Sequence, residues 1–384
     1  MESKQRQDDA DAWFFESFKR YTNLYMYEFE APVDTMELLD PMSLITSGIQ
    51  AYSKKCEILQ LAVPPKLLPK DIEEGLCKDR DFKIISGGYS STRIIQVQPI
   101  GADRVAVAVQ SDQEGLGLFQ LGNDDHGVIT EEKRLQFPAE QQKLHNSSVW
   151  GPGVLATRGR KVILGDRNGS YVCQWSLDAQ DKGICHPLPN QHHVLQIKKI
   201  QYWDDNVVAF CTSKGSILFY DLLQPMDKPV TTIESPPTAL ASDSAVLCHS
   251  FDTHPSENIL GLLNSSGKFE IFDIKKPDSP VVSTILPGYD HLSVLQGKFN
   301  LQFQKLQTQS PSDYYAKFIA TGFKDEMIPV YECTKAGDIR PLFTHDGHTK
   351  IVTTAMWHTA SDNLLFSSSI DAVLHAWQYI ENEM

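Results

Sequence analysis

Three histidines and a tryptophan lie within the segment FTHDGHTKIVTTAMWH (343–358). Histidines can bind zinc, and a histidine beside a serine and an aspartate can activate a nucleophile. The zinc hypothesis for His345, His348 and His358 is weak because no cysteine or carboxylate stands at ligand spacing, and catalytic zinc needs three protein ligands. The nucleophile hypothesis is weak because the chain has no strained G-x-S-x-G turn.

Other sequence signatures of catalysis are also missing. The chain has neither a G-x-x-x-x-G-K-[ST] phosphate loop nor a G-x-G-x-x-G dinucleotide fingerprint. The nearest match, GLGLFQLG (115–122), falls in a predicted strand, where its glycines serve packing. The sequence therefore predicts a protein that is not an enzyme and that uses no cofactor and no metal.

The histidines belong to a repeated strand pattern. Three hairpins align without gaps, and in each a residue of the turn precedes the closing aromatic by five positions: Gly215 and Tyr220, Gly267 and Phe272, Ala372 and Trp377. The aligned segments are VVAFCTSKGSILFYDL (207–222), ILGLLNSSGKFEIFDI (259–274) and LLFSSSIDAVLHAWQY (364–379). An internal repeat of short strands and polar turns predicts an all-β ring of small sheets.

The repeat predicts one seven-bladed β-propeller over residues 23–384. We expect a strand at 24–31 to pair with the last unit as its outer strand, because a ring needs closure. An acidic segment and a short helix are predicted for residues 1–22. The approximate blades are 34–62, 82–121, 147–178, 192–222, 245–275, 297–332 and 345–380.

Around the opening segment, Gly347-His348, Asp371 and Trp377 resemble the signature of WD-repeat propellers. In that family a histidine, a strand serine or threonine, the turn aspartate and the tryptophan form a hydrogen-bonded chain within a blade. The resemblance implies a structural chain of His348, Ser369 (or Ser367), Asp371 and Trp377. Gln378 departs from the signature, since aspartate is usual there. Buried histidine, serine and indole groups need such partners in any fold.

Charge and cysteine content limit the partners and the location. Lysine and arginine total 35 against 49 acidic residues, a formal net charge of −14, which disfavours direct binding to nucleic acid or to anionic membranes. Dispersed cysteines are typical of free thiols in a cytosolic or nuclear protein. The sequence shows no signal peptide and no membrane-spanning run. The cysteines are Cys56, Cys77, Cys173, Cys185, Cys211, Cys248 and Cys333.

Two stretches fall outside the repeat and supply candidate partner contacts. Residues 8–21 have helical periodicity, and their aromatic residues pack on the propeller or anchor a partner. Residues 78–93 are rich in charge and glycine, which fits either a binding loop or a turn. The candidates are Trp13, Phe14, Phe18, Arg80, Phe82 and Tyr89.

The chain as a whole resembles the family of WD repeat-containing protein 73. The shared blocks are DAWFFESFKRYTNLYMYEF, KDRDFKIISGGYSSTRI, IRPLFTHDGHTKIVTTAMWH and LLFSSSIDAVLHAWQY, in that order. The resemblance implies a non-catalytic scaffold that helps assemble the Integrator RNA-cleavage module, which acts in snRNA processing. The implied partners are Integrator subunits 9 and 11 and their HEAT-repeat cofactor.

The same resemblance implies a cytoplasmic protein with some nuclear presence, linked to spindle poles and the cytoskeleton during cell division. Microtubule surfaces are acidic, so the negative charge favours indirect, protein-mediated association with them. We expect a monomer within a hetero-complex.

Two other functions stay open. A ubiquitin-ligase substrate receptor is one, although such propellers usually end a blade in Trp-Asp-x-Arg and this chain has Tyr220-Asp221-Leu222-Leu223 at the corresponding place. An enzyme that uses the central channel is the other, and mutation of one pocket residue would reveal it.

Overall fold

The computed structural model describes most of the chain as strands joined by short turns. The described residues are 13, 19–67, 81–101, 104–111, 115–122, 127–137, 153–166, 171–178, 183–188, 196–234, 249–254, 257–287, 294–295, 298–305 and 314–381. Among them, no helix is long and apolar enough to cross a membrane. The predicted N-terminal helix falls almost wholly outside these residues.

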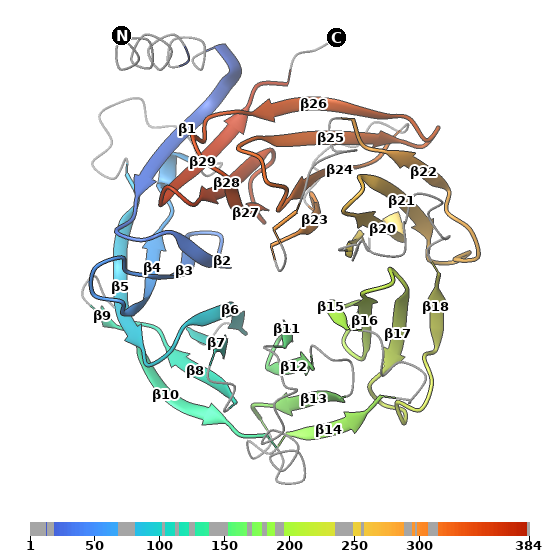
Figure 1. The fold of residues 1–384 in the computed structure, drawn as a ribbon, viewed down its shortest axis with the longest axis horizontal. Coiled ribbons are helices and arrows are strands. Elements are labelled where there is room, and N and C mark those ends of the chain that lie inside the picture. The colour runs from blue at the N-terminus through green and yellow to red at the C-terminus, as the bar shows by residue number, and fades with distance from the viewer. Residues whose placement is uncertain are drawn as a thin grey trace.

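Seven small sheets follow one another around a central axis (Figure 1). The first contains β2 (Val33–Asp40), β3 (Ser43–Ile49), β4 (Cys56–Ala62), β5 (Lys83–Ser90) and the short β9 (Gly127–Val128), with a 3-10 turn η1 (Pro65–Leu67) after β4. The second contains β6 (Ile94–Ile100), β7 (Val105–Gln110), β8 (Leu116–Gln120) and β10 (Thr130–Leu135). The third contains β11 (Val154–Arg158), β12 (Lys161–Gly165), β13 (Tyr171–Ser176) and β14 (Ile184–Pro187).

The remaining four sheets repeat this meander. The fourth contains β15 (Ile197–Tyr202), β16 (Val207–Thr212), β17 (Ile217–Asp221) and β18 (Thr231–Ile233), and the fifth β19 (His249–His254), β20 (Ile259–Asn264), β21 (Lys268–Asp273) and β22 (Val282–Ile285). The sixth contains β23 (Asn300–Phe303), β24 (Tyr314–Thr321), β25 (Ile328–Thr334) and β26 (Ile339–His345). The seventh contains β27 (Val352–Trp357), β28 (Leu364–Ser369), β29 (Val373–Tyr379) and β1 (Tyr21–Glu28).

The architecture confirms the predicted seven-bladed propeller and its closing strand. The first strand of each blade contacts the first strand of the next, and β27 contacts β2, so the circle closes. β1 pairs antiparallel with β29 from Tyr21↔Tyr379 to Glu28↔Val373, and Figure 1 shows the two side by side. The last blade is therefore built from both ends of the chain.

Apolar packing between blades forms the core. Seven clusters of buried hydrophobic residues are present, and each spans one pair of adjacent blades. Neighbouring blades cover both faces of a sheet, which explains why β20 and β28 are buried along their whole length. The apolar packing continues across the closure of the ring, because one cluster contains residues of both the seventh and the first blade.

The aligned turn positions have a common backbone geometry. Gly215, Gly267 and Ala372 all have positive φ, at 86°, 80° and 67°. Only glycine adopts this region without steric penalty, so the recurring glycine has a physical cause and Ala372 is the strained member of the series. The sequence repeat therefore reflects a repeated turn between the second and third strands of a blade.

Two expectations need correction. The segment 83–90, which we grouped with the second unit, is β5, the fourth strand of the first sheet, paired to β4. The expectation of free thiols throughout is wrong for Cys173 and Cys185, which form a disulfide between the neighbouring strands β13 and β14. Sequence spacing does not reveal this pair, because only the strand register places the two residues opposite each other.

Candidate functional site: the histidine cluster of the closing blade

Ser367 is the centre of a buried hydrogen-bonded group in the seventh blade. Its hydroxyl lies 2.8 Å from Nε2 of His348 and accepts a hydrogen bond from the indole N–H of Trp377 at 3.1 Å. β28 carries the serine, β29 the tryptophan, and the loop before β27 the histidine. All three side chains are buried. The predicted chain thus runs through Ser367, the alternative serine, and not through Ser369.

Asp371 belongs to a separate group at the turn between β28 and β29. Its carboxylate accepts hydrogen bonds from the hydroxyls of Ser369 and Thr349, the latter at 2.9 Å. Burial alone would raise the pKa of Asp371, but these hydrogen bonds hold it below its usual value. Nδ1 of His348 has no hydrogen-bond partner among the described residues. The structure therefore divides the predicted set into His348–Ser367–Trp377 and Ser369–Asp371.

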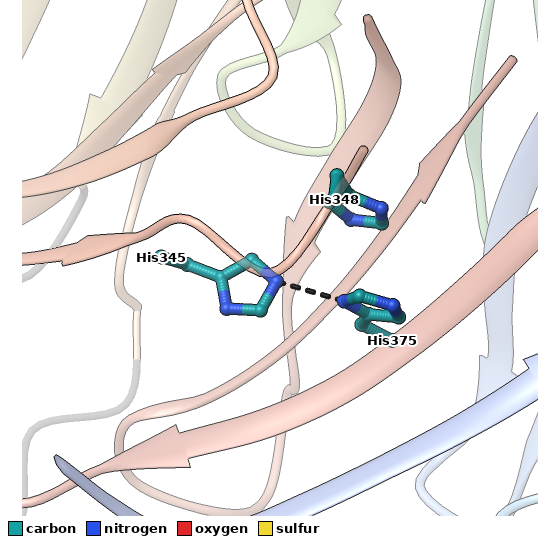
Figure 2. A group of neighbouring side chains, drawn as sticks. All are labelled: His345, His348 and His375. Carbon is teal, nitrogen blue, oxygen red and sulfur yellow. Dashed lines mark hydrogen bonds between the residues drawn. The ribbon is translucent and has the colours of Figure 1, made fainter. Parts of the chain in front are cut away.

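Two further histidines extend the group into a cluster, which we define as His345, His348 and His375 (Figure 2). Nε2 of His345 lies 2.9 Å from Nδ1 of His375, and Nδ1 of His345 lies 2.8 Å from the hydroxyl of Tyr21 on β1. The ring of His348 stacks on His375, with centroids 4.0 Å apart and planes 8° apart. The polar contacts therefore join β1 to β29 through His345, the last residue of β26, and His348 adds a stacking contact from the loop before β27.

Burial keeps the cluster neutral. It lowers the pKa of His348 to about 4 and that of His375 to about 3, and it holds the pKa of His345 well below the usual value for histidine. Desolvation by burial is the main cause for all three rings, and repulsion by the charged form of a neighbouring histidine adds to it for His345 and His375. At neutral pH the rings act as hydrogen-bonding and stacking groups without charge.

The cluster fits a metal ion poorly. One nitrogen from each ring lies within 4.8 Å of the others, and neutral imidazoles are the ligands that zinc prefers. A ring nitrogen, however, donates its lone pair in the plane of its own ring. The planes of His348 and His375 are nearly parallel and stacked, so their lone pairs do not converge on one point. His358, a candidate ligand in the sequence, instead bonds the carbonyl of Pro41.

The same geometry does not form a catalytic triad. Ser367 has 0% exposure, so a substrate has no access to its hydroxyl. Among the described residues, no carboxylate hydrogen-bonds to His348 to orient it as a base. The arrangement can hold strands together and exclude water.

Three consecutive serines allow a matched test of this structural role. Ser367→Ala is expected to destabilise the protein by about 2–3 kcal/mol, because the indole N–H of Trp377 and a ring nitrogen of His348 lose their shared partner. Ser368→Ala is the control, since the buried Ser368 hydroxyl has no hydrogen-bond partner among the described residues. Ser369→Ala should cost about 1 kcal/mol at the turn. Urea unfolding measures all three, and equal losses would contradict the assigned role of Ser367.

Comparison with known proteins identifies the relatives of this fold. No protein-family model matches the chain. The Danio rerio protein named Integrator complex assembly factor WDR73 is 24% identical over 389 residues, covering 97% of this chain and 97% of the relative. The Homo sapiens protein of the same name is 25% identical over 399 residues, covering 97% and 98%. The Mus musculus protein is 21% identical over 387 residues. The chain is a WD-repeat propeller homologous to these WDR73 proteins. The resemblance drawn from the sequence blocks is confirmed.

The candidate contact residues of this WDR73 homologue occupy different environments. Trp13 is half-buried on its own propeller: its indole N–H donates to Asp346 at 2.9 Å, and its ring packs over Gly347. Phe82 is a core residue with 6% exposure, in ring contact with Tyr27 and Phe366, so it offers no surface to a partner. Tyr89 is 53% exposed on β5. Phe14, Phe18 and Arg80 lie outside the described residues.

Sequence reasoning missed His375 and Tyr21 as members of the cluster. The alternation of side chains along a strand places His375 on the same face as Trp377, two residues later, so this signal was present. Tyr21 could not be found in this way, because its contact with His345 depends on which strand closes the ring.

Proposed function

We propose that this chain is a non-enzymatic scaffold that binds the Integrator RNA-endonuclease module and helps to stabilise or assemble it. The observation that carries the proposal is the similarity to proteins named Integrator complex assembly factor WDR73 over 97% of both chains. Similarity over the whole ring supports a shared role better than a match to one blade would. The propeller supports the role physically, because a rigid ring presents loops from several blades on one platform.

The proposed partners are subunits 9 and 11 of Integrator and their HEAT-repeat cofactor. The proposed complex forms in the cytoplasm before the nuclease acts in the nucleus. With a disulfide between Cys173 and Cys185, cysteine content gives no support to a cytoplasmic location, so the location rests on the family resemblance. Spindle-pole association is proposed on the same ground and through a protein intermediary, since the chain carries a net charge of −14.

Affinity purification tests the proposal. The full chain, tagged at the C-terminus and expressed in cells, should co-purify both nuclease subunits from a cytosolic extract, as identified by mass spectrometry. A related propeller with the same tag is the control for non-specific capture. Recovery of neither subunit from any fraction would refute the proposal, and depletion of the protein should lower the steady-state level of both subunits.

A further inference from the structure

We propose that Cys173 and Cys185 form a reversible thiol–disulfide switch that sets how firmly the outer strand of blade 3 is held. The two cysteines lie opposite each other on β13 and β14, and the disulfide between them is a covalent tie across this strand pair. β14 is the last strand of its sheet, and Figure 1 shows it at the outer edge of the ring. Reduction of the disulfide therefore loosens the rim of the propeller and leaves the inner strands of the blade in place.

Apart from the disulfide, the middle of β14 has few attachments. The strand pairs with β13 at four positions, from Gln174↔Ile184 to Tyr171↔Pro187. Proline has no backbone N–H, so the last of these positions lacks a donor. Ile184 is 62% exposed, and within β14 only Cys185 packs against an apolar cluster of the described residues. Backbone hydrogen bonds at an exposed edge open more readily than those of the core, so a covalent tie has a large effect on the local stability of β14.

Other contacts fix the two ends of this segment. Gly183 lies against the ring of Trp175, since a Cβ there would come within 2.4 Å of the indole Nε1. Leu188 is buried in the apolar cluster between blades 3 and 4. Reduction therefore loosens residues 184–187 without detaching the strand. Both reduced cysteines remain small apolar side chains that pack on the same cluster, so the fold survives reduction, as a reversible switch requires.

Cys185 carries the sulfur that a reductant reaches first. Cys173 is 1% exposed, whereas Cys185 is half-buried at the rim. The thiolate of a thiol reductant attacks the Cys185 sulfur, the disulfide bond breaks, and Cys173 leaves as a thiolate that takes up a proton. A second thiol of the reductant then displaces Cys185, which also takes up a proton. The protein gains two electrons and two protons, and the two reductant thiols become one disulfide. A small disulfide oxidant reverses both steps.

The free cysteines that the structure describes do not compete in this exchange. Cys56, Cys211 and Cys333 are buried thiols. Burial raises the pKa of Cys211 and that of Cys333 to about 12, so both stay protonated, and a protonated thiol does not attack a disulfide. Cys77 and Cys248 lie outside the described residues. Among the described cysteines, exchange is therefore confined to the pair on β13 and β14.

The pair fits a regulatory site better than a permanent crosslink. Disulfides of cytoplasmic proteins are mostly transient or redox-sensing, because glutathione and thioredoxin keep thiols reduced there. The cytoplasmic location is part of the proposed function, and this step of the inference rests on it. The two cysteines are separated by 12 residues in the sequence. Closing a short loop restricts the unfolded chain less than closing a long one, so the main effect of this disulfide is local.

Redox titration of the purified full chain tests the switch. The chain is equilibrated in glutathione buffers that range from fully oxidised to the reduced ratio of the cytosol. Free thiols are then alkylated, and peptide mass spectrometry measures the fraction of the Cys173–Cys185 disulfide. The disulfide should form in the oxidised buffers, be largely reduced at the cytosolic ratio, and form again on return. Persistence at the cytosolic ratio would make it a permanent crosslink, and failure to form in any buffer would leave no switch. Either result overturns the inference.

Hydrogen exchange measures the effect on the strand. On reduction, the amides of β14 should exchange roughly tenfold faster, whereas those of β18, the outer strand of blade 4, should stay within about twofold. Cys173→Ala/Cys185→Ala should show fast exchange at β14 in both oxidising and reducing buffers. Equal exchange of β14 in the two states of the wild type would refute the switch, and this comparison decides the matter even where the variant does not fold.

These outcomes are separate from those of the proposed function. None of the measurements involves an Integrator subunit, so failure of the switch leaves the scaffold proposal intact. Failure to recover the nuclease subunits would remove the argument from location and leave the titration and the exchange measurement to decide the switch.

Discussion

Removal of residues 1–28 is expected to abolish cooperative folding of the whole ring. β1 is the outer strand of the seventh blade and pairs along its length with β29. The amide of Ile380 also donates to the carbonyl of Arg20, and that of Phe29 to Ala372, so the pairing extends beyond both ends of the strand. A propeller blade cannot fold alone, because its faces and edges need neighbours.

The interior contacts of β1 explain why its removal destabilises more than the seventh blade. Tyr21 is 6% exposed and packs with Trp377 and Phe343 in the cluster between blades 6 and 7. Tyr25 and Tyr27 pack against the cluster between blades 7 and 1. Loss of one strand therefore opens two blade interfaces. A destabilisation of the order of a domain's whole stability, about 5–15 kcal/mol, follows.

Near-ultraviolet circular dichroism and urea unfolding measure the effect of this deletion. Removal of residues 1–12 is the matched control, because it leaves Trp13, Arg20 and β1 in place, and it should unfold within about 1 kcal/mol of the full chain. A synthetic peptide of residues 19–31 should partly restore the native signal of the longer deletion. A sharp two-state transition for the chain without residues 1–28, close to that of the wild type, would contradict the closure.

The repeat made the fold predictable. Aligned hairpins with an aromatic five residues after a turn glycine point to one recurring unit, and the positive φ of Gly215, Gly267 and Ala372 shows the backbone reason. The closing strand was predictable because a ring of sheets must join its two ends. β5 was assigned to the wrong blade because the sequence of a strand between two repeats does not show whether it pairs with the repeat before it or with the one after it.

The candidate site was less predictable, because it depends on side-chain direction. Ser367 and Ser369 both point to the same side of β28, and only the depth of each within the blade determines which one meets His348 and Trp377. The disulfide and the contact of Tyr21 with His345 need the register of strand pairs that sequence alone leaves open.

Acidification is expected to weaken the fold steeply between about pH 6.5 and pH 4, through the histidine cluster. Burial holds the pKa of His348 at about 4 and that of His375 at about 3, while both have the ordinary value of 6.5 in the unfolded chain. In this window the unfolded state binds more protons than the folded state, so stability is complete above pH 6.5 and falls as pH falls. Each such histidine contributes about 1.4 kcal/mol per pH unit.

Other titrating groups add to or oppose this pH dependence of stability. A mutation within the cluster is therefore needed to measure the contribution of the cluster itself. Burial also lowers the pKa of His249, in blade 5, to about 4, which acts in the same direction. Burial raises the pKa of Glu37 to about 7, and that carboxyl group acts in the opposite direction, since its folded form gains a proton first. His375→Phe keeps an aromatic ring against His348 and removes one titrating group. Its stability should fall by about 1.4 kcal/mol less per pH unit than that of the wild type.

Urea unfolding at pH 7, 6, 5 and 4.5 gives the slope for each variant. His186→Asn is the control, because His186 is half-buried on β14, away from the cluster, and its pKa is lowered by burial without neighbouring histidines. Removal of the His186 side chain should change the pH dependence of stability less than removal of the His375 side chain. Equal slopes for the wild type and His375→Phe would mean that the buried rings do not resist protonation. The polar group that joins β1 to β29 would then be open to water, and the closure of the ring would depend on the backbone pairing of these two strands and on apolar packing.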